Sequence, residues 1–284
     1  GPIAEWDVSA VFDMSYLFQN LRNFNTNISS WGTSGVTDMR NMFENAHAFN
    51  QPLSFDTSSV TNMNTMFQYA VAFNQPLNFD TSSVTNMDAM FSLAARFNQP
   101  LSLNTSSVTT MIGMFHYAAV FNQPLSFDTS KVTKMLYMFR YAAAFNQPLS
   151  FDTSRVTSMT YMFRYAAAFN QPLSFDTSSV TAMPGIFFGA TALSDANKFW
   201  IRCAWEGTSA FASAGYDSSW GTGNCASPRQ PPPSPPSPPG IFTSTAPLKT
   251  AVQAYNDDAE SAVATYGPIA EWDVSAVFDM SYLF

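Results

Sequence analysis

The chain has 284 residues, of which 46% are hydrophobic and only 11% are charged, so it can bury a sizeable core with few ion pairs. Its formal net charge of −8 argues against nucleic acid as a partner, because phosphate backbones are bound by clustered cationic side chains. No stretch approaches the roughly 20 consecutive apolar residues of a membrane-spanning helix, so we expect no membrane insertion. Because it begins at Gly1 without an initiator Met or a signal peptide, we interpret it as a mature fragment or a piece of a longer protein.

One sequence motif recurs at a nearly constant interval through residues 1–193. Its valine falls at eight positions, with a spacing of 25 once and of 24 thereafter. These positions are Val11, Val36, Val60, Val84, Val108, Val132, Val156 and Val180. A fixed period in this range predicts a solenoid, whose units bury their apolar faces only by stacking on one another. We therefore expect residues 1–193 to form a stack of about eight such coils, one for each valine.

Each coil is expected to contain a short strand and a short helix. In the segment PLSF, Leu53 and Phe55 alternate with polar residues, as in a strand with one buried face. Further along the same coil, apolar residues recur at helical spacing: Val60, Met63, Met66, Phe67 and Ala70. This half is predicted to be a short α- or 3₁₀-helix with Ser59 or Thr61 as its N-cap. The predicted fold class is therefore an α/β repeat solenoid.

Stacking at about 4.8 Å per coil would align equivalent residues into ladders that form the core. The predicted leucine ladder is Leu53, Leu77, Leu101, Leu125, Leu149 and Leu173. The predicted phenylalanine ladder is Phe67, Phe91, Phe115, Phe139 and Phe163. The methionines lie in a repeated MxxMF frame, so we interpret them as core filling by a flexible side chain rather than as a binding groove.

Two polar columns follow from the same period. Asparagines of the FNQP segments are expected to accept from one coil's backbone and donate to the next: Asn50, Asn74, Asn98, Asn122, Asn146 and Asn170. A second column holds aspartates and is interrupted by Gly32 and Asn104: Asp7, Asp56, Asp80, Asp128, Asp152 and Asp176. A calcium ladder would relieve their repulsion, which is only about 0.9 kcal/mol per neighbour in water. Because the glycine-rich calcium repeat is absent, we favour Asx-turns and expect no cofactor.

The segments WDVSAVFDMSYLF, FDTSSVTNMNTMF and AFNQPLSFDTS resemble the BspA-like leucine-rich-repeat surface proteins, also known as the Mycoplasma lipoprotein-associated repeat. The resemblance implies a leucine-rich-repeat-like solenoid on a surface or secreted protein, often linked to adhesion, and no enzymatic activity. Two departures are Phe12, where most units have Thr, and MPGI at residues 183–186, where Pro and Gly would break the helix of the last coil.

Residues 194–226 are predicted to be a C-terminal cap that covers the end of the core. The segment LSDANKFWIRCAWEG indicates a helix capped at Ser194. Cys203 and Cys225 are the only cysteines, and a pair fits one disulfide in an oxidising compartment. The alternative is two buried free thiols.

Residues 227–245 are predicted to be a Pro/Ser-rich linker, with polyproline II over residues 228–239 and a length of about 37 Å. The Ser-Pro run resembles the hydroxyproline-rich, O-glycosylated spacers of algal and plant extracellular proteins, and so suggests an algal-type protein. Its candidate sites for O-glycosylation or hydroxyproline are Pro231, Pro232, Pro233, Ser234, Pro235, Pro236, Ser237, Pro238 and Pro239. Candidate N-glycosylation sequons begin at Asn27 and Asn104.

Residues 1–18 recur without a change at residues 267–284. The simplest interpretation is one 266-residue period of a tandem array, and the alternative is a recent duplication at the termini. Residues 246–266 have amphipathic helical spacing and lead directly into the second copy. They are predicted to be the N-terminal helical cap of the next domain, and residues 267–284 its first coil.

The sequence shows no arrangement of residues that indicates a catalytic site. His47 and His116 lie in different coils, and no nucleophile is placed beside a base, so we expect no enzyme. Basic and aromatic residues gather in two adjacent coils: Lys131, Lys134, Arg140, Arg155, Arg164, Tyr137 and Tyr161, with Tyr141 and Tyr165 in the same window. One coil apart, Lys131 would stack on Arg155 and Arg140 on Arg164. Stacked like charges suggest an acidic partner, either a neighbouring domain or an anionic glycan, but a solvated face is equally compatible.

These features lead to a structural hypothesis. We expect a subunit of an extracellular fibre or cell-surface appendage, built from tandem solenoid domains that are joined by proline rods. Its partners would be copies of itself, with glycans or other surface proteins as further candidates. The alternative is a cell-surface adhesin or a glycan- or protein-binding module.

Overall fold

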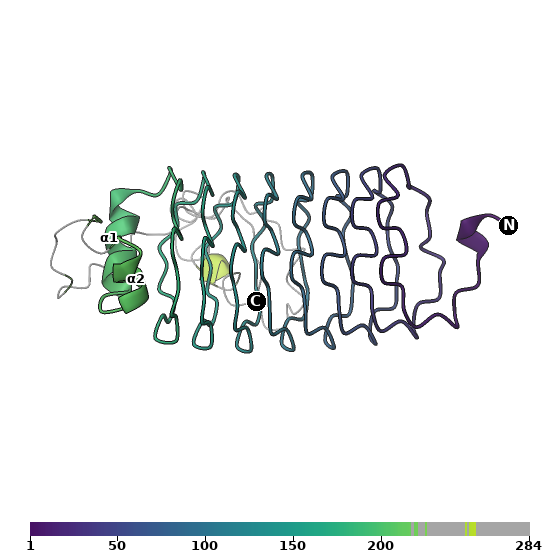
Figure 1. Ribbon diagram of the computed structural model, residues 1–284, viewed down its shortest axis with the longest axis horizontal. Helices are drawn as coiled ribbons and strands as arrows, with labels where there is room; N and C mark the ends of the chain where they lie inside the picture. The colour runs from purple at the N-terminus through teal and green to yellow at the C-terminus, as the bar shows by residue number, and fades with distance from the viewer. Residues whose placement is uncertain (217–218, 221–224, 226–247, 249, 254–284) are drawn as a thin grey trace. The chain divides into compact units, whose positions relative to one another are not determined.

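A computed structural model describes residues 1–216, 219–220, 225, 248 and 250–253 (Figure 1). The chain divides into two compact units, Gly1–Pro228 and Arg229–Phe284. In the second unit Leu248 and residues 250–253 are helical, within the segment for which helical spacing was noted. The predictions for residues 227–245 and 267–284, and most of that for residues 246–266, lie outside the described residues.

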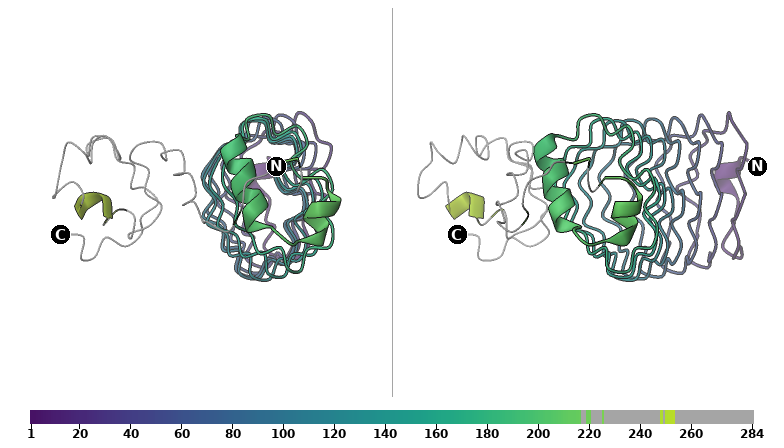
Figure 2. Two further views of the ribbon diagram at one scale, coloured as in Figure 1. Left: turned by 90° about the vertical axis from the view of Figure 1, so that its left-hand side faces the viewer. Right: turned by 60° about the vertical axis from the view of Figure 1, so that its left-hand side comes forward.

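The described part of the first unit is a stack of coils, and its helices lie before the first coil and after the last. Figure 1 shows successive coils side by side, and Figure 2 shows them overlying one another when the stack is seen from its C-terminal end. The 3₁₀-helix η1 (Ile3–Glu5) precedes the coils, and the helices α1 (Asp195–Ala204) and α2 (Ser209–Ser213) follow them. The described chain is therefore a tandem-repeat protein in which each coil contacts its neighbours.

Consecutive coils are held in a fixed register. Parallel bridges join residues 24 or 25 positions apart: Asp13, Asp38, Asn62, Asn86, Thr110, Lys134, Ser158 and Ala182, each to the next. Around this column, alternate backbone N–H groups donate to the following coil, as from Met63 to the Asn86 carbonyl at 3.1 Å and from Phe67 to the Met90 carbonyl at 2.9 Å. The coils thus pair through their backbones as well as through their side chains.

The helix predicted in each coil is wrong. In its place the chain makes successive turns, in which Met66 N–H donates to the Met63 carbonyl and Ala70 N–H to the Phe67 carbonyl. Thr65 and Tyr69 have φ of 53° and 56°, which a right-handed helix excludes. Turns with three-residue steps keep the apolar side chains inside at nearly helical spacing, so periodicity alone could not separate the two structures. The neighbouring coil supplies the hydrogen-bond acceptors that a helix would have found within itself.

The predicted strand is correct in its burial pattern but not in its pairing. Leu53 and Phe55 are buried and alternate with exposed Ser54, as expected. Among the described residues, however, only the Leu77–Leu101 bridge joins these segments, and no longer strand is formed. The inter-coil ladder runs instead through the half that was expected to be helical. The α/β class is therefore not confirmed, because the described coils consist of turns and isolated bridges.

Stacks of phenylalanine rings run through the core. The predicted ladder is present, with the Phe67 and Phe91 ring centroids 5.7 Å apart. A second ladder, which the sequence analysis did not identify, comes from the FNQP phenylalanines, and Phe73 lies 4.1 Å from Phe67 within one coil. Every methionine in the described part of the chain is buried, as core filling predicts. The leucine ladder is also buried, except that Leu149 is only partly covered.

Polar columns satisfy the backbone between coils. Asn74 N–H donates to Asn50 Oδ1 at 2.9 Å, and the pattern continues to Asn170, so the accepting role of the asparagines is confirmed. The Gln75 side chain supplies a second donor to the same oxygen at 3.2 Å. A further column was not predicted: buried Thr57 donates from Oγ1 to the Asp80 carbonyl of the next coil at 2.8 Å. Such bonds avoid the cost of unpaired buried groups.

The last coil passes directly into α1. Ser194 takes the next place in the asparagine column, because its N–H donates to Asn170 Oδ1 at 2.9 Å. Its Oγ also accepts from Asn197 N–H, so Ser194 caps the helix as predicted. Pro184 breaks no helix, and its carbonyl instead accepts from Tyr161 N–H, which keeps the last coil paired with its neighbour. The stack therefore ends at a helix that continues its hydrogen-bond column.

Candidate interaction surface

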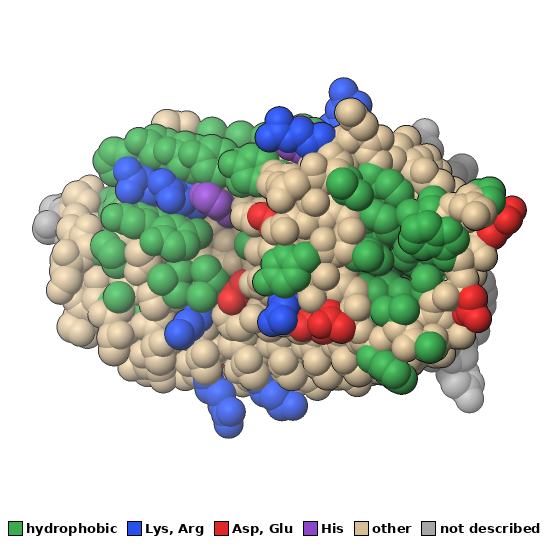
Figure 3. Space-filling view, turned by 45° about the vertical axis from the view of Figure 1, so that its right-hand side comes forward, with side chains coloured by type: hydrophobic (Ala, Val, Ile, Leu, Met, Phe, Trp, Pro, Cys, Tyr) green, Lys and Arg blue, Asp and Glu red, His purple; other side chains and the backbone are tan. Residues whose placement is uncertain are grey.

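The structure brings together part of the predicted basic and aromatic cluster. Arg140 and Arg164 lie between two rows of tyrosine rings that run along the stack. We call these seven residues the Arg–Tyr surface: Tyr117, Tyr137, Arg140, Tyr141, Tyr161, Arg164 and Tyr165. In Figure 3 a line of Lys/Arg and His side chains lies between two bands of hydrophobic ones towards the C-terminal end of the coils.

The guanidinium groups are held by ring contacts. Arg140 Cζ lies 5.5 Å, 5.2 Å and 5.7 Å from the ring centroids of Tyr137, Tyr141 and Tyr161. Arg164 Cζ lies 4.7 Å and 5.3 Å from the centroids of Tyr161 and Tyr165. These distances fall within the range of cation–π attraction. Each arginine is therefore braced on both sides by tyrosine.

The tyrosine rows are themselves stacked. The Tyr141 ring centroid lies 4.2 Å from that of Tyr117 and 4.7 Å from that of Tyr165, and the planes are within 19° of parallel. In the other row Tyr137 and Tyr161 are 5.7 Å apart. The ring faces of both rows are therefore occupied by neighbouring rings and by the guanidinium groups.

The tyrosines occupy backbone positions that do not favour them. Tyr137 and Tyr141 both have a φ of 60°, in the left-handed region. In other coils of this chain the same structural places hold Asn41, Gly113 and Gly189, residues that adopt this conformation more readily. The turn therefore does not require tyrosine. A Cβ on Gly185 would lie 2.8 Å from the Tyr161 ring, so that ring rests on space that a glycine leaves open.

The positive charge of the surface is not neutralised by a carboxylate. The ion pairs of the described residues are Arg40 with Asp38 and Lys198 with Asp195, and neither involves Arg140 or Arg164. The Nε atoms of both surface arginines are buried and have no hydrogen-bond partner in the described structure. Two guanidinium groups therefore stand one coil apart with no ion pair to a carboxylate of the described residues.

His116 occupies the equivalent place one coil before Arg140. Its ring packs edge-on against Tyr117 at 4.6 Å, and its Nε2 is buried without a partner in the described structure. Burial, and then the charge of Arg140, lower the pKa of His116 to about 4. The column is therefore neutral at His116 near neutral pH and positive at the two arginines.

Three of the predicted basic residues do not belong to this surface. Lys131 and Arg155 are exposed beside the aspartate turns of their coils, and Lys134 lies in the bridged column. None of them makes a cation–π contact in the described part of the chain. Burial raises the pKa of Asp88, while Lys134 acts in the opposite direction. The sequence spacing placed all five cations in two coils but could not assign them to different faces.

The aspartate column forms Asx-turns, as favoured. Asp56 Oδ1 accepts from Ser58 N–H at 3.1 Å and from Ser58 Oγ at 2.7 Å, and these bonds hold the pKa of Asp56 below its ordinary value. The same pair of bonds recurs at Asp80, Asp128 and Asp152. No group of three or more His, Cys, Asp or Glu able to hold a metal ion occurs within the described ranges. The expectation that no cofactor is bound stays a prediction.

Both candidate N-glycosylation sites are exposed. Asn27 Oδ1 accepts from Ser29 N–H at 2.9 Å, and Asn104 Oδ1 accepts from Ser106 N–H at 3.1 Å. Asn104 thus makes the same turn as the aspartates of its column. The candidate O-glycosylation sites lie outside the described residues.

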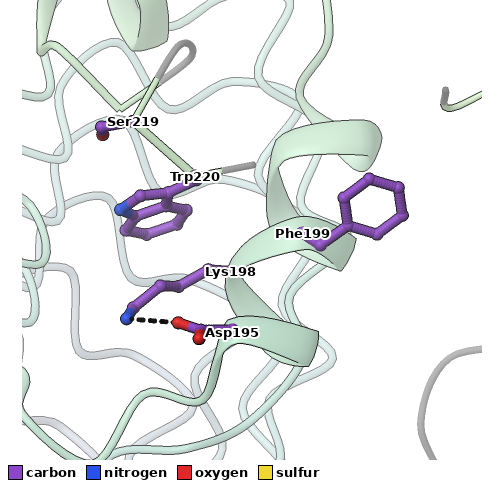
Figure 4. A pocket seen from close by; sticks show the side chains of 5 residues that line it. All are labelled: Asp195, Lys198, Phe199, Ser219 and Trp220. Carbon is purple, nitrogen blue, oxygen red and sulfur yellow. Dashed lines mark hydrogen bonds and ion pairs between the residues drawn. The ribbon is translucent and has the colours of Figure 1, made fainter. Parts of the chain in front are cut away.

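A hollow of about 500 Å³ lies at the C-terminal cap and is lined by Asp195, Lys198, Phe199, Ser219 and Trp220 (Figure 4). Lys198 Nζ pairs with Asp195 Oδ1 at 3.0 Å, and Phe199 points away from the other four side chains. Ser219 Oγ donates to the Gly215 carbonyl rather than to a base. The lining residues therefore hold no nucleophile that is paired with a general base.

The two ends of the stack differ in exposure. Of the nine large hydrophobic side chains exposed in the described residues, five belong to residues 6–21: Trp6, Phe12, Tyr16, Leu17 and Leu21. We call these five residues the first-coil face, and Figure 3 shows hydrophobic side chains gathered at this end. At the other end Trp205 is buried against Phe175 and Phe187, and a disulfide joins Cys203 to Cys225.

Comparison with known proteins relates the chain to one family. Three overlapping stretches, residues 1–102, 53–145 and 125–217, match the model described as "Mycoplasma protein of unknown function, DUF285". No curated protein matches the chain, and no solved structure does. None of the helices in the described residues is long and apolar enough to cross a membrane. Because the three matches together span residues 1–217, the chain belongs to the DUF285 family of Mycoplasma proteins of unknown function and repeats that family's unit in tandem.

Proposed function

We propose that this protein is a structural subunit of an extracellular fibre or cell-surface appendage, in which solenoid domains follow one another in tandem. The observation that carries the proposal is the first-coil face. Its members Phe12 and Trp6 are 65% and 55% exposed, whereas the opposite end of the stack is buried beneath Trp205. A gathered apolar surface of this kind marks a place of association.

The repeated terminal sequence supports the same proposal. Residues 267–284 are identical to residues 1–18, so four of the five residues of the face have a second copy in the chain. Residues 246–266 precede that copy and would cover it. Within them Leu248 and Ala251 are buried and Thr250 is exposed, a one-sided pattern that suits a capping helix. Covalent linkage would hold each domain near the next at high effective concentration. Head-to-tail contacts that do not close into a ring would then extend the assembly into a filament.

The extracellular setting is part of the proposal. The Cys203–Cys225 disulfide is compatible with an oxidising compartment, and the Pro/Ser-rich segment with a glycosylated, algal-type spacer. As part of this proposal we keep the hypothesis that the solenoid is leucine-rich-repeat-like and BspA-like. The role proposed is non-enzymatic and needs no cofactor.

The test compares filament formation by the full chain and two surface variants. Electron micrographs of native material and of the purified full chain should show regular filaments or linear oligomers. Phe12→Asp, on the first-coil face, should abolish them, because the charge would have to be buried in the contact. Val120→Asp is the matched control, since Val120 is 44% exposed but lies in a middle coil. Isolated domains in every sample, or equal loss in both variants, would refute the fibre.

A second candidate is a cell-surface adhesin or a glycan- or protein-binding module. The Arg–Tyr surface favours it, because two braced guanidinium groups without a carboxylate partner are available to a ligand. This role is compatible with a fibre, since the surface and the first-coil face are separate sets of residues.

A further inference from the structure

We propose that the Arg–Tyr surface binds an extended anionic polysaccharide, with Arg140 and Arg164 as the residues that contact its carboxylate or sulfate groups. This inference rests on the second candidate function, that of a binding module, and does not depend on fibre formation. It names the class of ligand and the residues that recognise it.

Ring contacts order the side chains of Arg140 and Arg164 in the absence of a ligand. A guanidinium group is planar and weakly hydrated, and it binds two oxygens of a carboxylate or sulfate at once. Arg140 is in contact with three tyrosine rings, and Arg164 with two and with Phe188 at 5.0 Å. Side chains that are already ordered lose little entropy on binding, so the contact contributes more to affinity.

The surface tyrosines occupy places at which the turn also accepts other residues. Tyr161 and Tyr165 have φ of 55° and 58°, although the turn accepts Gly185 and Gly189 in the next coil. The positive φ itself recurs at the same places in earlier coils, as at Thr65, Tyr69 and Leu93, so it belongs to the repeat and not to this surface alone. The tyrosines brace the arginines and present hydroxyl groups, which glycine or asparagine at the same places would not do.

The periodic layout favours a polymer over a compact ligand. Arg140 and Arg164 are equivalent residues one coil apart, so their charges repeat along the stack at about the 4.8 Å spacing of paired chains. The hydroxyl-bearing rings of Tyr117, Tyr141 and Tyr165 run parallel to them. This track offers cationic and hydroxyl donors in line, which suits a hydroxyl-rich chain with regularly placed anions. A protein partner would rely on an apolar anchor in a desolvated pocket, and the hollow described at the cap includes none of these residues.

Binding of defined polymers to the full chain tests the proposal. The probes are dextran sulfate, polygalacturonate, neutral dextran and polyglutamate, measured by titration calorimetry at low and high salt. We expect dextran sulfate, polygalacturonate or both to bind, with affinity falling as salt rises, and neutral dextran not to bind. Binding of one polyanion alone identifies the anionic group as sulfate or carboxylate.

Variants separate this surface from general electrostatic attraction. The double variant Arg140→Gln, Arg164→Gln should weaken binding about tenfold or more, since charged hydrogen bonds are lost. Lys131→Gln, Arg155→Gln is the matched control, because it removes the same charge from the same two coils on another face, and its affinity should be unchanged. Arg140→Lys, Arg164→Lys keeps the charge without the planar fork and should give an intermediate loss. Near-ultraviolet circular dichroism checks that each variant is folded.

Several results would overturn the inference. Equal loss in the control pair would show non-specific attraction, and polyglutamate binding as tightly as the polysaccharides would assign the surface to an acidic protein. If binding to polyglutamate or dextran depends on Arg140 and Arg164, the binding-module function stands and only the ligand class is wrong. If the wild-type chain binds none of the four polymers, the ligand class fails, and the binding-module function loses the observation that favours it.

Discussion

At its C-terminal end the coil stack meets a segment that does not belong to the repeat. Phe187 lies beneath Trp205 at 5.8 Å and Trp220 at 5.1 Å, and α1 continues the asparagine column through Ser194. At its N-terminal end Phe12 and Leu17 are exposed. A coil of this type covers its neighbour but leaves its own outer side open, so every stack needs a different structure at each end. This difference in exposure between the two ends is the observation on which the proposed association through the first-coil face rests.

The largest effect is expected in the middle of the stack, where both sides of a coil are covered. Phe115→Ala should lower the free energy of unfolding by about 3–5 kcal/mol, because coils fixed by backbone pairing cannot collapse into the cavity. Ser107→Ala, in the partly exposed turn of the same coil, is the control and should change it by about 0.5 kcal/mol or less. Thermal and urea unfolding of the two variants measures the difference. Equal melting temperatures would contradict the ladder of phenylalanine rings.

The comparison of the two ends is tested by truncating one aromatic residue at each. Trp205→Ala should destabilise by about 3 kcal/mol, at the lower end of the range for a buried tryptophan because the end of a stack has room to relax. Phe12→Ala should cost about 0.5 kcal/mol or less in the isolated domain, since the side chain is 65% exposed. Both are measured by urea unfolding under dilute conditions. A large loss from Phe12→Ala would show that the N-terminal end is already covered.

Reduction of the Cys203–Cys225 disulfide should destabilise the C-terminal cap by about 2–3 kcal/mol, because it frees a loop of moderate length in the unfolded state. Hydrogen exchange should then accelerate first in α1 and in the last coil, and only later in the central coils. Mass spectrometry of the unreduced protein should show the two cysteines linked. Uniform acceleration along the whole stack would contradict a local capping role.

A pH dependence of modest size is expected to arise in the middle of the stack. The folded-state pKa of His116 is lowered to about 4, so the unfolded chain binds its proton near pH 6.5 and the folded chain does not. The stability contributed by neutral His116 is complete above pH 6.5 and is lost as pH falls towards 4. Because the ring is partly exposed, the loss should be about 1 kcal/mol rather than the full value of the shift.

Urea unfolding at pH 7 and pH 4.5 measures this loss, and His116→Gln should flatten it. The aspartate turns titrate in a separate window, since hydrogen bonds lower the pKa of Asp56 and Asp80 below 3.8. Exchange protection should weaken first around His116 and not at either end. An unchanged pH dependence in His116→Gln would assign the effect to another group.

Much of this architecture was predictable from the printed residues. The regular spacing of Val60, Val84 and their equivalents predicted the register, since equivalent residues of stacked coils must coincide. The asparagine column, the aspartate turns and the cap at Ser194 followed from side chains that bond to nearby backbone. Such features depend on the side-chain types and on the repeat period, and both can be read directly from the sequence.

The remaining features depended on partners from neighbouring coils. Whether Met63 to Ala70 formed a helix or a series of turns was decided by carbonyl groups of the following coil, which accept the N–H groups that a helix would bond internally. The separation of Arg140 from Lys131 was decided in the same way, because the turns set which face each side chain joins. The repeat period and the residue composition would be the same whether this segment formed a helix or turns, and whichever face Arg140 and Lys131 joined. Only the hydrogen bonds between stacked coils distinguish them, and those bonds do not exist until the coils have assembled.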